Sequence, residues 1–316
     1  MQPSKQLTVI ISFLNEGYEV ERTVSSVLEF AENKVDILVI NDGSNSLYDY
    51  EEMLRPYSNV KYVKNEVRRG VTVCRHWGVQ QIKTPYFILL DAHMRFYEKG
   101  WVDKIISYLQ EDDRRILCCQ TRALIKDESE EIVLYPNRRT SYGAYIILQQ
   151  KDKLLSPKWI YESRMYSDKA IEDVPCVLGA TYAASKRYWN HIKGLEGLEM
   201  YGYEEPYISM KTWLEGGKCQ LIKDIEVGHI YRTKFPYRVG NDEMMYNRMW
   251  IASVLLPEAW KKRVYEMSQK QNDFIFQSVM TRLEEKGAII KDLRNYYQQI
   301  CTNDFALIEQ LNFNKL

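Results

Sequence analysis

The sequence lacks an excess of charge of either sign, because its 316 residues hold 43 lysines and arginines against 43 aspartates and glutamates. This balance is not that of a protein that coats DNA or RNA, and we expect no nucleic-acid partner. No run of about 18 apolar residues occurs, so we expect no membrane-spanning helix. The short apolar stretch near the N-terminus has no small-residue cleavage site and is not typical of a signal peptide. We therefore expect a cytoplasmic protein, with the inner face of the membrane as the alternative location.

Cysteines are few and poorly spaced for metal binding. None of the six forms a C-x-x-C pair, and the adjacent Cys118 and Cys119 lie in an apolar stretch. We expect buried, reduced thiols, as is usual in a cytosolic chain. Aromatic residues are plentiful, with 24 Tyr and 7 Trp. They suit stacking surfaces for sugars or bases, and a large core would explain them equally well.

Apolar strand-like runs and helical periodicity alternate over the first 120 residues. This alternation predicts an α/β protein with βαβ units on a parallel sheet, in which ligands bind beyond the carboxyl ends of the strands. Three polar clusters, at residues 12–16, 41–44 and 91–93, fall at such ends. The predicted strands are 7–14, 35–40, 60–63, 86–90 and 116–119, and the predicted helices are 20–31, 70–82 and 102–109.

The second half of the chain is less regular. Residues 122–173 are polar and irregular and predict long loops with short strands, whereas 204–214 predicts a helix that ends at Gly216. Beyond about 237 the pattern is almost wholly helical, with predicted helices at 242–255, 257–270, 273–286 and 292–303. We expect these helices to pack on the core. The alternatives are contact with a second copy of the chain in a homo-oligomer, or with a membrane surface.

The clearest chemical signal is Asp91-Ala92-His93, directly after a predicted strand. Two side chains one residue apart project to the same side of an extended chain, and a carboxylate with an imidazole suits Mn²⁺ or a similar ion. His229 is a candidate third ligand. The alternative is a strand-end turn with ordinary structural histidines, which is also our interpretation of His76 and His191.

Two further residues are candidates for nucleotide contacts. Asp42 ends the second predicted strand and could accept hydrogen bonds from a base or a ribose, although simple turn chemistry would also explain it. Arg75 lies on the following helix and could meet phosphate, the alternative being a solvated helix charge.

Several separated stretches together resemble family 2 glycosyltransferases and, more closely, the polypeptide N-acetylgalactosaminyltransferases. The similar stretches, in chain order, are 9–16 (VIISFLNE), 41–44 (NDGS), 68–70 (RRG) with Arg75, 91–93 (DAH), 201–205 (YGYEE) and 228–232 (GHIYR). They resemble the opening strand, D-D/N-x-S, R-x-G…AR, D-x-H, W-G-G-E-N and G-H-V-F-R of that branch. Together they cover roughly residues 6–235.

This resemblance implies a GT-A fold, a divalent cation such as Mn²⁺ and a UDP-sugar donor. We expect a catalytic domain at 1–236, with a nucleotide-binding half at 1–121 and an acceptor-binding half at 122–236. A C-terminal helical region would follow at 237–316. By the resemblance the metal ligands are Asp91, His93 and His229, and the catalytic residues are Glu204 and Glu205. The expected nucleotide-binding residues are Ser12, Glu16, Asp42, Arg75 and Asp91.

The sequence departs from the branch at three positions of one motif. Tyr201 stands for Trp, and Tyr203 stands for Gly, so we expect a bulky phenol in the donor-sugar pocket, which counts against N-acetylgalactosamine as the donor sugar. Glu205 stands for Asn. In family 2 enzymes the matching carboxylate is a general base for inverting transfer, whereas transfer in the N-acetylgalactosaminyltransferase branch is retaining. The stereochemistry therefore stays open.

The leading hypothesis is a metal-dependent hexosyl- or N-acetylhexosaminyltransferase that acts on a glycan, glycoconjugate or protein. The sequence shows neither a ricin-like lectin module nor an N-terminal anchor, so we expect a bacterial-type role in cell-surface glycan synthesis. One alternative is a nucleotidyltransferase, although residues 12–16 lack its Gly-rich loop. The other is a non-catalytic module that binds nucleotide sugars.

Overall fold

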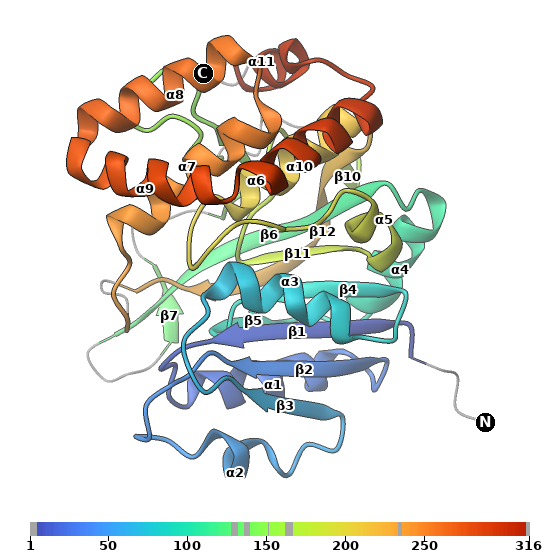
Figure 1. The fold of residues 1–316 in the computed structure, drawn as a ribbon. Coiled ribbons are helices and arrows are strands. Elements are labelled where there is room, and N and C mark those ends of the chain that lie inside the picture. Colours follow the sequence, from blue (N-terminus) through green and yellow to red (C-terminus); the bar gives the residue numbers. More distant parts are fainter. Residues whose placement is uncertain are drawn as a thin grey trace.

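The protein folds around one large mixed sheet, which a computed structural model describes for residues 5–127, 132–135, 140–150, 152–161, 167–232 and 236–313. The strands follow the order β10-β12-β6-β11-β4-β1-β2-β3, with β5 added to β12 and β7 added to β6 (Figure 1). The strand bounds are β1 Leu7–Phe13, β2 Val35–Asn41, β3 Val60–Lys64, β4 Tyr86–Leu90, β5 Met94–Phe96, β6 Arg115–Lys126, β7 Ile132–Leu134, β10 Ile171–Asp173, β11 Thr181–Ser185 and β12 Lys218–Ile230. A separate pair consists of β8 Ala144–Ile146 and β9 Pro157–Trp159.

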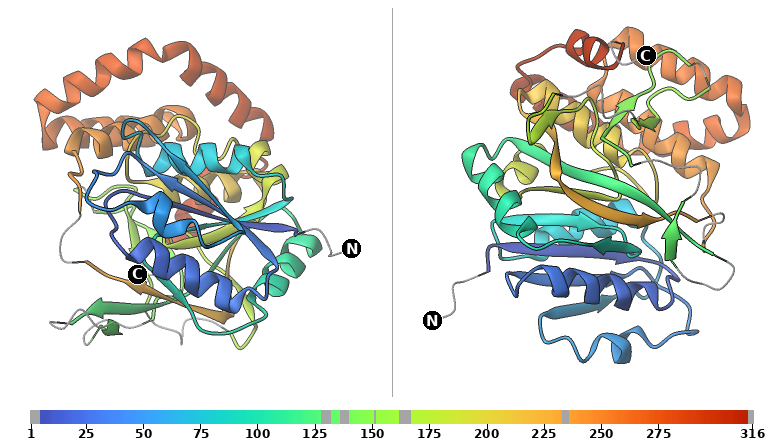
Figure 2. Two further views of the ribbon diagram at one scale, coloured as in Figure 1. Left: turned by 90° about the horizontal axis from the view of Figure 1, so that it is seen from below. Right: turned by 180° about the vertical axis from the view of Figure 1, so that it is seen from behind.

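Helices cover both faces of this sheet because its strands are apolar on both sides. On β1, Leu7, Val9 and Ile11 face one hydrophobic core, whereas Ile10 belongs to the other. The first core is covered by α1 Glu19–Phe30 and α4 Trp101–Glu111, and Figure 2 shows α1 lying over this face. The second core lies under α3 Val71–Gln81, α5 Lys186–His191 and α6 Glu204–Glu215.

The C-terminal helices stack on the outer side of α6 and extend the second core (Figure 1). They are α7 Asn241–Leu255, α8 Glu258–Gln271, α9 Asp273–Glu285, α10 Gly287–Ile300 and α11 Phe305–Phe313. The predicted core packing is confirmed for α7, in which Met245, Met249, Ile251 and Val254 are buried. Among the residues that the structure describes, no helix is both long and apolar enough to cross a membrane.

The predicted parallel sheet is only partly correct. Strands β1 to β4 pair in parallel, and so do β6 and β12, but β11 lies between β4 and β6 and is antiparallel to both. The apolar pattern of residues 174–184 marks a buried strand without giving its direction. Because β11 pairs antiparallel with β6, the chain enters β11 from the end of the sheet toward which β6 runs.

Several element bounds also differ from the prediction. Strand β6 continues to Lys126 where loops were expected, and β12 is a long strand that reaches Ile230. Helix α10 begins at Gly287, which was expected to separate two helices. The short elements α2 Tyr50–Leu54 and β5, and the terminal helix α11, were not predicted.

Candidate active site

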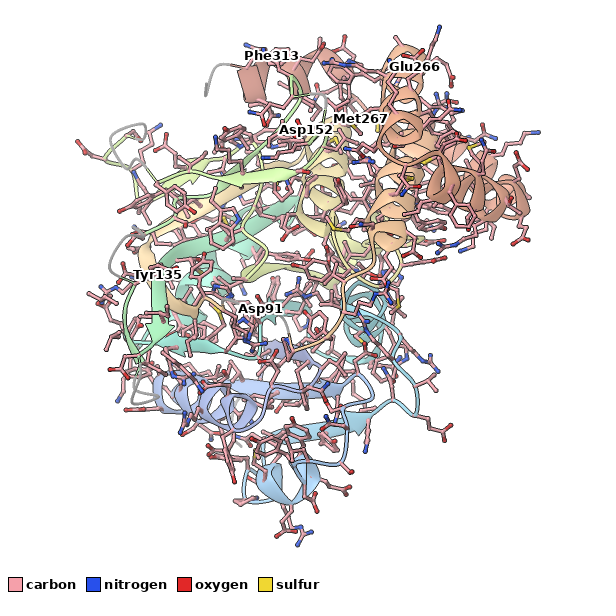
Figure 3. All side chains as sticks on the ribbon, turned by 90° about the vertical axis from the view of Figure 1, so that its left-hand side faces the viewer. Asp91, Tyr135, Asp152, Glu266, Met267 and Phe313 are labelled. Atoms are coloured by element: carbon pink, nitrogen blue, oxygen red, sulfur yellow. The ribbon has the colours of Figure 1, made fainter. Side chains whose placement is uncertain are left out.

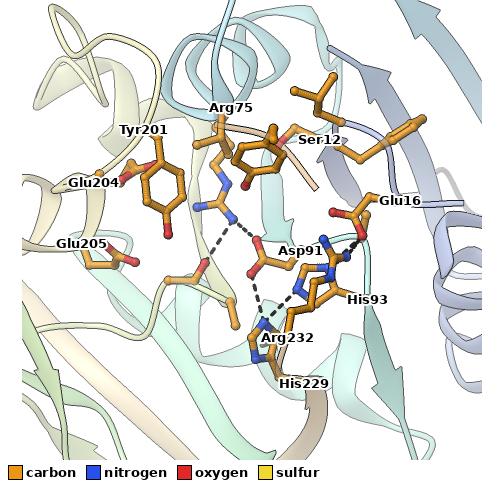
Figure 4. Close-up of a pocket in the computed structure, with 18 of the residues that line it drawn as sticks. Ser12, Glu16, Arg75, Asp91, His93, Tyr201, Glu204, Glu205, His229 and Arg232 are labelled. Atoms are coloured by element: carbon orange, nitrogen blue, oxygen red, sulfur yellow. Dashed lines mark hydrogen bonds and ion pairs between the residues drawn. The ribbon is translucent and has the colours of Figure 1, made fainter. Parts of the chain in front are cut away.

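Asp91, His93 and His229 meet in one cluster near the carboxyl ends of the central strands. Asp91 directly follows β4, and His93 directly precedes β5. Strand β5 pairs antiparallel with β12 and places His229 opposite Met94, the neighbour of His93. The Nε2 atoms of the two histidines lie 3.1 Å apart, and His229 Nε2 lies 3.3 Å from Asp91 Oδ2 (Figure 4). Figure 3 shows Asp91 near the centre of the molecule, far from Glu266 on α8.

The donor atoms of this cluster fit a divalent cation. One atom from each residue lies within 4.8 Å of the others. Ligands about 2.0–2.4 Å from an ion and at right angles to each other are about 3 Å apart, which agrees with the two short spacings. Two imidazoles and one carboxylate suit Mn²⁺ and similar ions. The cluster therefore has the composition and the spacing of a cation site.

The charge states in the cluster also favour a cation. Burial alone would raise the pKa of Asp91, but the Arg75 guanidinium and a hydrogen bond from His229 outweigh it and lower the pKa to about 2. Arg75 Nη2 donates to Asp91 Oδ1 at 2.6 Å. Burial lowers the pKa of His93 despite the neighbouring carboxylates. An ionised carboxylate beside a neutral imidazole is the state that metal binding requires.

Glu16 and Arg232 contact His93 at Nδ1, whereas His229 lies beside its Nε2. The Glu16 carboxylate pairs with Arg232 and lies 3.3 Å from His93 Nδ1, and Arg232 Nη2 lies 2.9 Å from that same nitrogen. If Nδ1 accepts from Arg232, then Nε2 carries the proton. If Nδ1 donates to Glu16, then Nε2 has a free lone pair. Cation binding at Nε2 therefore requires the second tautomer, which makes Glu16 the orienting partner of His93.

The remaining nucleotide candidates line the same cavity of about 520 Å³. Ser12 is almost buried, and its hydroxyl has no hydrogen-bond partner among the described residues. Asp42 is also buried, and its oxygens accept hydrogen bonds from the backbone N–H groups of Arg69 and Gly70, both at 2.8 Å. In this structure Asp42 fixes the loop before α3, and a direct contact with a base or ribose stays a prediction.

Glu204 and Glu205 face the cavity from the first turn of α6. Burial, and for Glu204 the adjacent carboxylate as well, raises the pKa of both side chains, although Arg75 opposes the shift. Gly179 makes room for Glu205, because a Cβ at this position would overlap the Glu205 carboxylate. A buried carboxylate with a raised pKa is suited to take up a proton near neutral pH.

Aromatic side chains form much of the remaining wall. Tyr203 lines the cavity, as expected from the sequence, and its hydroxyl lies 3.4 Å from both Ser156 Oγ and Arg248 Nη1. The Trp159 ring lies 5.1 Å from that of Tyr231, which in turn lies 4.5 Å from His229.

Sequence reasoning did not single out several residues of this site. Arg232 belongs to the motif that revealed His229, so a signal was present for it. Gly179 and Trp159 lie in segments without a recognisable motif, and only the tertiary fold brings them to the cavity.

A Rossmann-like sheet with this cluster at its strand ends is the arrangement of GT-A glycosyltransferases, a class that includes glycosyl transferase family 2. The model for that family matches residues 8–175, and the chain belongs to this family. It is distantly related to the polypeptide N-acetylgalactosaminyltransferases. It is 27% identical to the human polypeptide N-acetylgalactosaminyltransferase 9 over 279 residues, 84% of this chain and 44% of that protein. To transferase 3 of Mus musculus it is 26% identical, over 92% of this chain and 47% of that protein. The chain thus spans about half the length of these curated relatives.

Solved structures give the same fold. The crystal structure of GalNAc-T7 with UDP, GalNAc and Mn²⁺ matches with a TM-score of 0.76 and 23% identity, over 98% of this chain and 57% of that one. Staphylococcus aureus TarS 1–349 in complex with UDP-GlcNAc matches with a TM-score of 0.51 and 13% identity, over 84% of this chain and 71% of that one. At these identities the likeness concerns the fold.

Proposed function

We propose that the protein is a metal-dependent glycosyltransferase that moves a sugar from a UDP-sugar to a hydroxyl group of a glycan, glycoconjugate or protein. The observation that carries this proposal is the joint placement of a cation-type cluster and a buried carboxylate pair in one cavity. The UDP class of donor is supported by GalNAc-T7 and TarS, whose structures contain UDP and UDP-GlcNAc.

Asp91, His93 and His229 would hold the cation, which would neutralise charge on the diphosphate leaving group. Arg75 fixes the Asp91 carboxylate, and Glu16 orients His93. Glu205 would accept the proton of the acceptor hydroxyl, with Glu204 beside it. The Tyr203 phenol would limit the volume available to the donor sugar, which favours a hexose without the N-acetyl group of N-acetylgalactosamine.

A cytoplasmic location is part of this proposal. It is supported by the six cysteines, all of them unpaired thiols and five of them buried. Persistent free thiols are typical of a reducing compartment.

The test is calorimetric titration of UDP with and without Mn²⁺, with GDP and CDP as competing candidates. We expect micromolar UDP binding that needs the metal and is weakened in His229→Ala. His191→Ala is the matched control, because His191 is half-exposed and pairs with Glu215 outside the cavity. A wild-type protein without metal-dependent nucleotide binding would contradict the proposal and leave a non-catalytic binding module as the better interpretation.

A further inference from the structure

The loop between α5 and α6, residues 192–203, forms one wall of the cavity in a strained conformation. It brings Tyr201, Gly202 and Tyr203 to the cavity and leads directly into Glu204. Met200 and Tyr203 have φ angles of 50° and 70°. These values lie in the left-handed region, which residues other than glycine rarely adopt. Such a conformation is strained and persists only where its surroundings hold it.

Asn247 of α7 holds this loop from the C-terminal side. Its side chain is fully buried, and its Oδ1 accepts from the Glu199 N–H at 2.8 Å. Its Nδ2 donates to the carbonyl oxygens of Glu199, Tyr201 and Gly202 at 2.7, 3.2 and 3.0 Å. One amide thus binds the backbone of three residues within four positions, immediately before the carboxylate pair.

Two further contacts complete the support. On the sheet side, Gly70 forms a bridge with Met200, and the Thr72 N–H donates to the Met200 carbonyl oxygen at 3.3 Å. On the helical side, the Glu199 carboxylate pairs with Arg282 and Lys286, at the C-terminal end of α9. The loop is therefore held between the start of α3 and the C-terminal helices, and Asn247 is a fully buried polar contact between α7 and this loop.

We propose that Asn247 is a positioning residue for sugar transfer, which holds the 199–203 backbone so that Glu204, Glu205 and the tyrosine wall face the donor sugar. This inference rests on the proposed function. It gives the C-terminal helices a role in the reaction although α8 to α11 contribute no residue to the cavity.

The experiment compares Asn247→Ala with Ser253→Ala, a matched loss of a buried polar group. Ser253 lies on the same helix and contacts Met249 and Tyr265 instead of the loop. Because misplacement of a reacting group by 1 Å can cost about 10²-fold, we expect kcat for UDP-sugar turnover to fall by that order in Asn247→Ala. The Kd of UDP with Mn²⁺ should stay unchanged, since Ser12, Asp42 and the cation cluster lie outside the loop. Ser253→Ala should keep its kcat.

Glu199→Gln is the second variant, because its partly exposed side chain makes misfolding less of a concern. Glu199→Gln should also lower kcat, by a smaller factor than Asn247→Ala does. Backbone hydrogen exchange gives a readout independent of activity: the Glu199 amide should exchange faster in Asn247→Ala and at the wild-type rate in Ser253→Ala.

The inference would be overturned if Asn247→Ala kept the wild-type kcat. It would also be overturned if Asn247→Ala and Ser253→Ala lost kcat and exchange protection to the same extent. A wild-type protein that binds UDP without transferring sugar would contradict the proposed function instead. The exchange rates of residues 199–203 would then decide the positioning role alone.

Discussion

The Glu205 carboxylate occupies a buried space beside Gly179. The missing Cβ of Gly179 provides the space, and burial raises the pKa of the side chain. Glutamine has almost the same shape but cannot accept the proton. We expect Glu205→Gln to lower transfer by about 10²–10⁴-fold, the usual contribution of a general base, without changing UDP affinity.

Steady-state kinetics and calorimetry on the same preparation check this expectation, with Glu204→Gln measured beside it. A loss well below about 10²-fold in Glu205→Gln would rule out its role as the base. A larger loss in Glu204→Gln would move that role to Glu204.

The raised pKa of Glu204 also has a consequence for stability. Burial and the neighbouring Glu205 make the folded state bind the Glu204 proton more tightly than the unfolded chain does. This contribution to stability is complete below the ordinary value near 4.5 and is lost as the pH rises through the higher folded pKa. Glutamine does not titrate, so Glu204→Gln does not lose this contribution. Its free energy of unfolding should therefore rise relative to that of the wild type as the pH increases from 5 to 8.

We expect a relative gain of the order of 1 kcal/mol or more, since each pKa unit of difference between the folded and unfolded states changes the stability by about that amount. Urea unfolding at both pH values in metal-free buffer measures it. A difference between the two proteins that does not change with pH would show that Glu204 is ionised in the folded state.

At the scale of elements, the contact between α3 and the α5–α6 loop depends on Gly70. Its φ is +92°, and a Cβ would overlap the backbone of Met200, which cannot move aside as a flexible side chain could. Gly70→Ala should therefore destabilise the fold by at least about 2 kcal/mol, as severe backbone clashes do. It should also weaken UDP binding, because Gly70 directly precedes the helix that carries Arg75.

Denaturant unfolding tests this expectation, with Gly287→Ala as the control. A Cβ at Gly287 meets nothing within 4 Å, so that exchange should be neutral or stabilise α10 by about 0.5–1 kcal/mol. Equal stabilities of the two variants would mean that the loop can shift away from α3.

The elements that the sequence predicted well are those with strong local patterns. Strands β1 to β4 and helices α1, α3 and α6 have periodic apolar residues and clear stop signals, and their bounds agree to within about two residues. The direction of β11 and the full length of β12 depend on pairing with distant strands, which no local pattern encodes.

The site residues also divide into those that a local sequence pattern marks and those that only the tertiary fold brings together. Asp91 and His93 lie one residue apart, so their proximity follows from the sequence, and a motif pointed to His229. The pairing of Glu16 with Arg232 and the contacts of Asn247 join residues more than 40 positions apart. Such contacts depend on how distant strands, loops and helices are brought together, and no local sequence pattern encodes them.

At the scale of the whole molecule, the residues that line the cavity come from a longer part of the chain than the family model matches. The match ends at residue 175, whereas the carboxylate pair and His229 lie beyond it. The predicted boundary between residues 236 and 237 remains a prediction, and one hydrophobic core extends across it from Ile10 to Ile308.

Removal of residues 237–316 should therefore prevent folding of the rest. Tyr207 of α6 would lose Tyr297, whose hydroxyl lies 3.2 Å from its own, and the buried Lys211 would lose the same partner. We expect a fragment ending at 236 to aggregate or to unfold without a cooperative transition. Calorimetry checks this result, and a fragment that unfolds cooperatively and binds UDP with Mn²⁺ would contradict it.

The pairing of arginines with carboxylates around the cation cluster has a thermodynamic consequence. Arg75 already compensates Asp91, and Arg232 compensates Glu16, so a divalent ion would enter a site with little net negative charge left to attract it. The diphosphate would supply the missing charge, and linkage requires each ligand to raise the affinity of the other by the same factor. The cation would then arrive with the nucleotide and become weakly held once UDP departs, so that product release and metal release form one event.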